Sequence, residues 1–395
     1  MIPRRDIKLY NGLITIALNW LFENKKHKSR KKFKAELSNY FSNENIFLLG
    51  GGRQAFHLIF DNNSFERGDE VVVPNYYLPV LIPIIKSKGL VPVFCDINKK
   101  TLSPDLEDLL DKINEDTRFM VLPHMFGLTG KVQEIVKSIK KKNENILIIE
   151  DCAHAFGSEY NEKKVGTFGD FALFSFNYIK TLSTLQGGML LVNNTEQIRK
   201  IKTDYFSNYT DLKKIKVLKH ILYYYLLILT LKTPLLYILK ISLKNKKLKK
   251  IIKKINNSKK KNWKREKLSP FLSFVGLKEL EKFEKKQKII NEKLSLYREK
   301  IDSDFWDKKP VGFESKWSKY YLTLVLGKNA KRMNNYFFSK KIDVSVKDEL
   351  MGVCSKNKKL QDSLAIYRNI VQFPLHENLK KEEIKKISDA INSLK

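Results

Sequence analysis

The sequence predicts an α/β fold in which a mostly parallel sheet carries helices on both faces, followed by a smaller α+β domain at the C-terminal end. Two observations predict the large sheet: short apolar runs bounded by turn residues, and segments of helix length between most of them. These runs lie at Val71–Val73, Val91–Phe94, Phe119–Leu122, Ile146–Ile149, Phe171–Phe176 and Met189–Val192. A third observation, two late strand-like stretches among helical ones, predicts the smaller domain.

The first fifty residues lead into a glycine turn. The apolar run near the N-terminus contains Asn19 and is not followed by a small-residue cleavage site, so we interpret it as part of the mature fold. A basic helix-like segment and the run IFLL then precede Gly50–Gly52, where three glycines allow close backbone approach to a ligand. A helix from Gln54 would direct its N-terminal N–H groups at a phosphate.

Chemically useful side chains gather where the central predicted strands end. Asp151 and His154 follow one run, and Ser175 and Lys180 follow another. Because open α/β folds bind ligands at the carboxyl ends of their strands, these four side chains are expected to meet in one crevice. The set suits pyridoxal phosphate (PLP), which needs a lysine for covalent attachment, an acid to keep its ring nitrogen protonated, and hydroxyl or N–H groups for its phosphate.

The motifs around these residues give a more specific signal than their spacing. EDCAHAFG, VGTFGD, FSFNYIKTL and a Gly-Gly pair follow one another between residues 150 and 188. This string resembles the DegT-type (DegT/StrS) aminotransferases, the nucleotide-sugar branch of the fold-type I PLP-dependent transferases. GGGRQAF, RGDEVVVPNYYLPV, LVPVFCDI, LPHMFGLTGKV and FPLHENLKKEEIKKI resemble further blocks of that family.

The resemblance implies roles for the residues of the crevice. Lys180 would hold PLP, and Asp151 would pair with the ring nitrogen. His154 would lie against the cofactor ring, although a histidine after a strand is also often a core residue. The family also places an aromatic side chain near Tyr76 and Tyr77, and the sequence leaves open which of the two faces the crevice. Asp170 is expected to cap or bridge rather than to catalyse.

Three further positions are expected to hold the cofactor phosphate together with Ser175. By resemblance these are Gly52 and Arg53 in the glycine turn and Asn262, which would reach the neighbouring subunit of a homodimer. The family often has a hydroxyl where Arg53 stands, but arginine can bind phosphate through its backbone or its side chain.

The resemblance implies an aminotransferase that converts a nucleotide-linked keto-sugar to an amino-sugar, with glutamate as donor, for cell-surface glycan biosynthesis. Some relatives replace the lysine by histidine and catalyse dehydration, so Lys180 favours transamination. Gln186 stands where the family commonly has glutamate. A sugar dehydratase, an aminotransferase for a lipid-linked substrate and a non-catalytic membrane-binding protein on the same scaffold remain alternatives.

Composition limits the partners and the compartment. The 395 residues carry 75 Lys and Arg against 43 Asp and Glu, a formal net charge of +32. This charge favours anionic partners such as nucleotide diphosphates or acidic lipid, or it is a lysine-rich bias of solvated faces. No specific nucleic-acid site is predicted. Three cysteines without CxxC spacing argue against disulfides and a structural zinc site, and favour a reducing, cytoplasmic compartment.

One segment has no counterpart in the family. We divide the chain into a large domain with its N-terminal arm (1–204), an insertion (205–262) and a small domain (263–395). The apolar part of the insertion is interrupted by Lys232 and Pro234, which predicts two short helices rather than a transmembrane span of about 20 residues. Lysine-rich sequence follows. The insertion either lies on an anionic membrane at its inner face or packs against the body or the dimer partner.

The small domain is predicted from its alternation of patterns. A long helical stretch covers Leu277–Lys300, and strand-like runs follow at Lys319–Gly327 and Ile370–Leu375. A terminal helix completes the α+β lobe.

Overall fold

The computed structural model describes residues 1–4, 28–232, 264–309, 321–327, 330–345, 352–357 and 359–395. The strands are β1 Ile46–Leu49, β2 Glu70–Pro74, β3 Tyr76–Tyr77, β4 Val91–Cys95, β5 Thr117–Pro123, β6 Leu147–Asp151, β7 Glu159–Tyr160, β8 Lys163–Lys164, β9 Phe171–Ser175, β10 Gly188–Val192, β11 Thr210–Asp211, β12 Glu266–Lys267, β13 Leu322–Val325, β14 Gly352–Val353 and β15 Ile370–Phe373. The helices are α2 Lys28–Phe41, α3 Gln54–Asn62, α4 Leu81–Ser87, α5 Leu106–Lys112, α6 Val132–Lys142, α7 Thr195–Asn208, α8 Lys214–Lys232, α11 Pro270–Leu280, α12 Phe283–Lys300, α13 Ser303–Trp306, α14 Ala330–Ser339, α15 Gln361–Asn369 and α16 Lys381–Asn392, with a 3-10 turn at Met125–Gly127.

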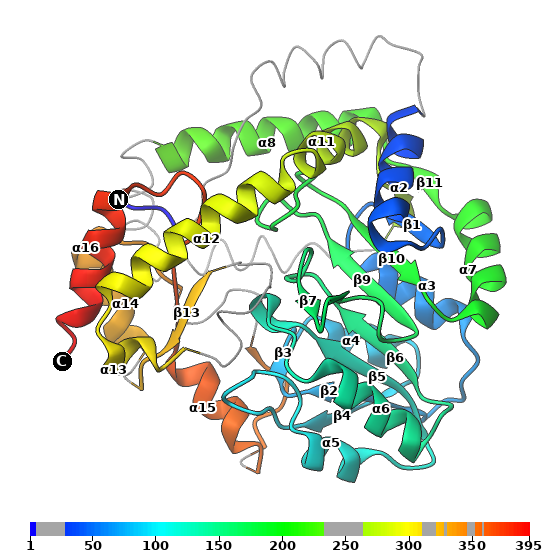
Figure 1. Cartoon of the computed structure of the whole chain (residues 1–395). Coiled ribbons are helices and arrows are strands. Elements are labelled where there is room, and N and C mark those ends of the chain that lie inside the picture. Colours follow the sequence, from blue (N-terminus) through cyan, green and yellow to red (C-terminus); the bar gives the residue numbers. More distant parts are fainter. Residues whose placement is uncertain (5–27, 233–263, 310–320, 328–329, 346–351, 358) are drawn as a thin grey trace, which may run out of the picture.

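Nine of the described strands form one sheet in the order β11-β12-β1-β10-β9-β6-β5-β2-β4 (Figure 1). The neighbours from β4 to β9 pair in parallel. β10 runs antiparallel to both β9 and β1. The predicted mostly parallel sheet is therefore confirmed, and each predicted apolar run supplies one of its strands.

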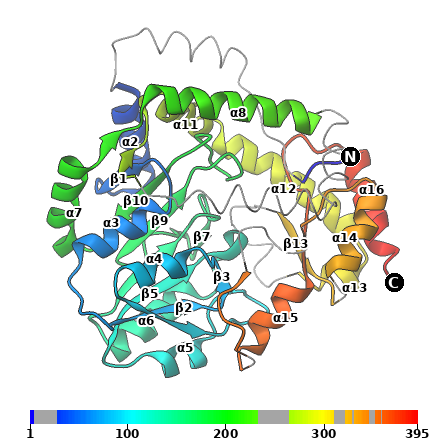
Figure 2. The same cartoon turned by 180° about the vertical axis from the view of Figure 1, so that it is seen from behind.

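Alternating side chains of the parallel strands enter different cores. In β2, Val71 and Val73 face one apolar cluster, whereas Val72 faces the other. Phe119 and Met120 of β5 divide in the same way. Helices α3 and α4 cover one face and α5 and α6 the other, as the opposite views in Figures 1 and 2 show. Burial on both faces explains why these strands are continuously apolar.

The C-terminal residues form a smaller lobe around β13 and β15. These two strands pair antiparallel, and Tyr297 of α12 donates a hydrogen bond to the Pro374 carbonyl beside them. The expected single helical stretch Leu277–Lys300 is wrong in one respect, because the chain turns at Glu281 and Lys282 between α11 and α12. β14 pairs with β3 at Tyr76 and Tyr77 in a separate two-stranded sheet, which links the C-terminal part of the chain to the segment directly after β2.

The predicted insertion starts within α7 and continues through β11, and one helix, α8, then lies at the rim of the molecule in both views (Figures 1 and 2). The described part of this helix runs to Lys232, and the interruption predicted at Lys232 and Pro234 reaches beyond the described residues. The second expected helix lies outside the described residues. Within the described ranges, no helix combines the length and the apolar character needed to cross a bilayer. The division of the chain at residues 204 and 262 stays a prediction.

Candidate active site

The carboxyl ends of three neighbouring strands place two predicted residues, Asp151 and Ser175, and one that was not predicted, His124, at one edge of the sheet. Asp151 is the last residue of β6, His124 directly follows β5, and Ser175 ends β9. β6 lies between β5 and β9, with Asp151 paired in register with Pro123 on one side and Leu173 on the other. The sheet alone therefore brings together positions that are about fifty residues apart in the chain.

Asp151 is a buried carboxylate with defined partners. Tyr77 donates a hydrogen bond to Oδ2, and the Ala153 backbone N–H donates one to Oδ1 at 2.9 Å. Burial raises the pKa of Asp151, and the Tyr77 and Ala153 hydrogen bonds and the positive charge of Lys180 oppose that rise. β6, which ends at Asp151, pairs with β9, and the loop after β9 carries Lys180. Of the two candidate tyrosines, Tyr77 is the one whose hydroxyl reaches Asp151.

Lys180 lies in a turn that the chain itself stabilises. Its backbone N–H donates to the Asn177 carbonyl at 2.8 Å, and the Tyr178 N–H donates to the Leu185 carbonyl at 2.9 Å. The Lys180 side chain is half-buried. The ring of Tyr178, two residues earlier, packs on Tyr224 of α8 with centroids 5.0 Å apart. The loop that carries the predicted catalytic lysine is therefore held by its own backbone hydrogen bonds and by the contact with α8.

The glycine turn packs directly against the end of β9. A Cβ atom on Gly52 would lie 3.2 Å from the Ser175 Cβ and 3.2 Å from the Phe174 carbonyl oxygen. A side chain at this position would press on both atoms, so glycine suits this close approach. α3 begins two residues later, at Gln54, as predicted. Arg53 is half-buried, and burial lowers the pKa of its guanidinium.

His154 and Gln186 have neighbours that the motifs did not indicate. The Phe126 N–H donates to His154 Nδ1 at 3.4 Å, and the two rings stack with centroids 5.8 Å apart. Gln186 donates from Nε2 to the Gly50 carbonyl at 3.2 Å, so it joins the lysine loop to the glycine turn. That His154 lies against a cofactor stays a prediction. Asn262 lies outside the described residues.

Asp170 has the bridging role that the sequence predicted. It accepts hydrogen bonds from the Ile148 N–H at 2.8 Å and from Asn194 Nδ2 at 3.0 Å. Lys140 pairs with the same carboxylate at 2.9 Å. These bonds lie at the amino end of β6, away from Asp151.

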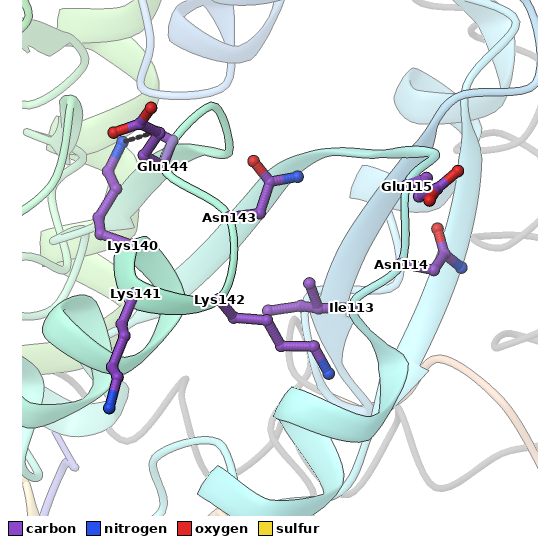
Figure 3. A pocket seen from close by; sticks show the side chains of 8 residues that line it. All are labelled: Ile113, Asn114, Glu115, Lys140, Lys141, Lys142, Asn143 and Glu144. Carbon is purple, nitrogen blue, oxygen red and sulfur yellow. Dashed lines mark hydrogen bonds between the residues drawn. The ribbon is translucent and has the colours of Figure 1, made fainter.

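A hollow of about 520 Å³ lies at that same amino edge (Figure 3). It is lined by Ile113, Asn114, Glu115, Lys140, Lys141, Lys142, Asn143 and Glu144. These residues precede β5 and β6, whereas the predicted catalytic residues follow those strands. The hollow is therefore separate from the candidate active site.

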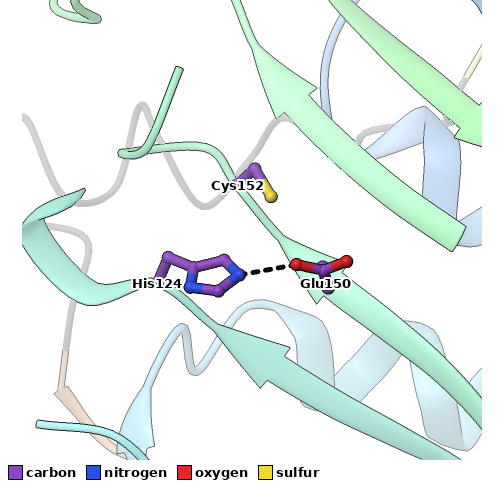
Figure 4. A group of neighbouring side chains, drawn as sticks. All are labelled: His124, Glu150 and Cys152. Atoms are coloured by element: carbon purple, nitrogen blue, oxygen red, sulfur yellow. Dashed lines mark hydrogen bonds and ion pairs between the residues drawn. The ribbon is translucent and has the colours of Figure 1, made fainter. Parts of the chain in front are cut away.

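Sequence reasoning missed a buried cluster beside Asp151, formed by His124, Glu150 and Cys152 (Figure 4). Glu150 Oε2 bonds to His124 Nε2 at 2.9 Å and to the Gly166 N–H at 2.8 Å. Oε1 accepts from the N–H groups of Phe168 and Gly169, both at 2.7 Å. All four acceptor positions of the carboxylate are thus used. This saturation makes Glu150 a structural clamp on the loop after β8 rather than a metal ligand.

We predict that Glu150→Gln lowers the free energy of unfolding by about 2–4 kcal/mol at neutral pH, because an amide group would face N–H donors in a buried place. Burial raises the pKa of Glu150, but the hydrogen bonds from His124 and the backbone outweigh burial and leave it below its ordinary value of 4.5. Stability from such a group is complete above the unfolded pKa and is lost as pH falls through the folded one. In urea unfolding, the difference in free energy of unfolding between the parent and Glu150→Gln should therefore narrow as pH falls below about 4.5.

The exposed Glu144→Gln serves as a control and should change stability by no more than about 0.5 kcal/mol. A Glu150→Gln variant as stable as the parent at neutral pH would contradict the clamp.

Comparison with known proteins now adds to this geometry. The sequence pattern of the DegT/DnrJ/EryC1/StrS aminotransferase family matches residues 17–392. The chain belongs to this family. Its cofactor is PLP, and the chain's fold is that of the fold-type I sugar aminotransferases, as the sequence predicted.

Individual relatives of this family match shorter stretches. GDP-perosamine synthase of Escherichia coli O157:H7 is 34% identical over 170 residues, which are 42% of this chain and 46% of that enzyme. GDP-4-keto-6-deoxy-D-mannose 3-dehydratase of Yersinia pseudotuberculosis is 29% identical over 174 residues, 42% of this chain and 44% of that enzyme. The chain thus spans less than half the length of these curated relatives in the matched stretches.

A solved structure extends the likeness to the whole fold. The PMP form of Spr1654 from Streptococcus pneumoniae superposes with a TM-score of 0.75 over 100% of this chain and 99% of that one, at 18% identity. At that identity the likeness is one of fold.

The described residues fit PLP on their own chemistry. The ring nitrogen of PLP requires a carboxylate, and its aldehyde requires a lysine. Its phosphate requires N–H and hydroxyl groups, which a glycine turn packed against a serine can offer. Asp151, Lys180, Gly52 and Ser175 supply them within one strand edge.

Proposed function

We propose that the protein is an aminotransferase that replaces the ketone of a nucleotide-linked keto-sugar by an amine, with glutamate as donor, in the biosynthesis of cell-surface glycans. The observation that carries the proposal is the buried carboxylate of Asp151 at the end of β6, next to the strand β9 whose following loop carries Lys180, in a chain of this family. Aminotransfer needs both groups, one to hold the cofactor and one to make it an electron sink.

Each residue then has a defined task. PLP supplies the electron sink when it is bound. Lys180 would hold it covalently and, once released, would move a proton between carbon atoms of the substrate and the cofactor. Asp151 would keep the ring nitrogen protonated, with Tyr77 and Ala153 fixing its two oxygens. Ser175, Gly52 and Arg53 would hold the phosphate, and His154 would limit the position of the ring.

To test this function, purified PLP-loaded protein is incubated with glutamate and a panel of nucleotide-linked keto-sugars, and the products are measured by mass spectrometry. The expected product differs from its keto-sugar by the exchange of a carbonyl oxygen for an amine, with one 2-oxoglutarate formed for each amino-sugar. Loss of water from the sugar without use of glutamate would instead identify a sugar dehydratase, the activity named for one relative. Lys180 favours the first outcome. If PLP loads but no nucleotide-linked sugar reacts, a lipid-linked sugar is the next substrate to try.

The same proposal includes a cytoplasmic homodimer with sites shared between subunits, in which a residue of the neighbouring chain, predicted as Asn262, completes the phosphate site. We predict that light scattering of the active enzyme gives twice the chain mass of 46.3 kDa. A fully active enzyme with the mass of one chain would contradict it.

A further inference from the structure

Helix α8 is apolar on two opposite faces, one of them buried and the other exposed. Val217, Ile221, Tyr224 and Ile228 are buried and recur at the spacing of one helix face. Three of these side chains, Val217, Ile221 and Tyr224, pack in the cluster that also contains Leu182 and Leu185 of the lysine loop. This inner face therefore accounts for how α8 is held on the body of the protein.

The outer face of α8 consists of Ile215, Leu222, Tyr223 and Leu226, whose exposed fractions are 57, 61, 54 and 55%. These residues follow one another at intervals of seven, one and three positions, which places them on one side of the helix. Among the described residues, the other exposed large hydrophobic side chains are Phe206 at 60% and Val91 at 44%. Exposed apolar groups gathered on one element indicate a contact surface rather than the usual scatter.

The charge of this segment indicates what the outer face contacts. From Leu212 to Lys232 the chain contains five lysines and no Asp or Glu. Lys219 is exposed and lies four residues after Ile215 and three before Leu222, so it shares their side of the helix. Apolar side chains bordered by lysines match the interface of an acidic bilayer, which accepts apolar groups and attracts cations.

We propose that the outer face of α8 docks the protein onto the surface of an acidic lipid bilayer. Leu222, Leu226 and Ile215 enter the acyl boundary, Tyr223 lies at the level of the headgroups, and Lys219 pairs with acidic lipids. The helix lies in the plane of the interface. Because its inner face packs through Tyr224 on Tyr178, docking sets the lysine loop close to the bilayer surface.

The test is co-sedimentation of the PLP-loaded full chain with vesicles of phosphatidylcholine alone or mixed with phosphatidylglycerol. Binding is expected only to the acidic vesicles, and it should weaken as salt shortens the range of the charges. The double variant Leu222→Ser, Leu226→Ser keeps every lysine and should lower the vesicle partition coefficient by at least about tenfold. Val91→Ser, which trims an exposed apolar side chain on β4, should bind as the parent does.

Two further measurements separate the possible failures. Light scattering of the double variant should give the parent's mass, and its PLP absorption should be unchanged, because neither leucine touches the cofactor site. The proposal is overturned if the full chain stays in the supernatant, or if the double variant binds like the parent, since lysines alone would then suffice. A double variant with half the parent's mass would show that this face joins two copies of the chain, and that also overturns it.

Discussion

Lys180→Ala is expected to bind PLP only non-covalently and to lose at least about 10³-fold in turnover, because a single amine both holds the cofactor and moves the proton. The fold should survive, since the turn around Lys180 is closed by backbone hydrogen bonds from residues 176, 178, 180 and 184 that do not use its side chain. Steady-state assays and the visible absorption of the cofactor measure both effects.

Lys163→Ala provides the matched control. Lys163 lies on the exposed β8 strand, packed over the Phe168 ring, and is outside the candidate site. Its removal should leave cofactor absorption and turnover at the parent's values. Substantial turnover in Lys180→Ala would show that another group performs the proton transfer.

Asp151→Asn is expected to keep the fold but to lose about 10²–10³-fold in turnover, because a neutral amide no longer favours a protonated ring nitrogen. The substitution is isosteric, and the Asn carbonyl can still accept the Ala153 N–H bond that Asp151 accepts now. A second readout is PLP affinity, which should fall as the charged partner is lost. Titration of cofactor absorption measures this directly.

Asp170→Asn tests whether any buried acid at this sheet would behave alike. Asp170 joins Lys140, Ile148 and Asn194 at the opposite edge, so its loss should reduce stability by about 1–3 kcal/mol and leave PLP affinity unchanged. Near-normal turnover in Asp151→Asn, or a loss of PLP in Asp170→Asn, would contradict the assignment of the two acids.

The sequence predicted the sheet well because burial on both faces leaves a simple signal, a short apolar run between turn residues. It also located Asp151, Ser175 and the Gly50–Gly52 turn at the correct strand ends. It did not predict the break between α11 and α12, where no glycine or proline marks the turn. There Phe283 packs against Phe156 at 5.0 Å, close to Gly157, so tertiary packing sets the boundary.

The sequence also did not predict which groups are the hydrogen-bond partners of the buried polar side chains. Tyr77 reaches Asp151 from β3, a two-residue strand that pairs with the distant β14, and nothing local in PNYYLP separates Tyr77 from Tyr76. The residues of the Glu150 clamp are easier to recognise in the sequence. A strand-end histidine in LPHMFG, the acid before Asp151, and the glycines of VGTFG are all present in motifs that the sequence analysis quoted. What was missing was the sheet order that makes β5 and β6 neighbours.

The most direct test of the whole account is to reduce the PLP-loaded protein with borohydride, digest it and map the modified peptide by mass spectrometry. The chain has 64 lysines, so a surface lysine modified by chance would rarely fall in the segment FSFNYIK. The account predicts one pyridoxyl group per chain, on Lys180. A group on any other lysine, or none on protein that has been saturated with PLP, would contradict it.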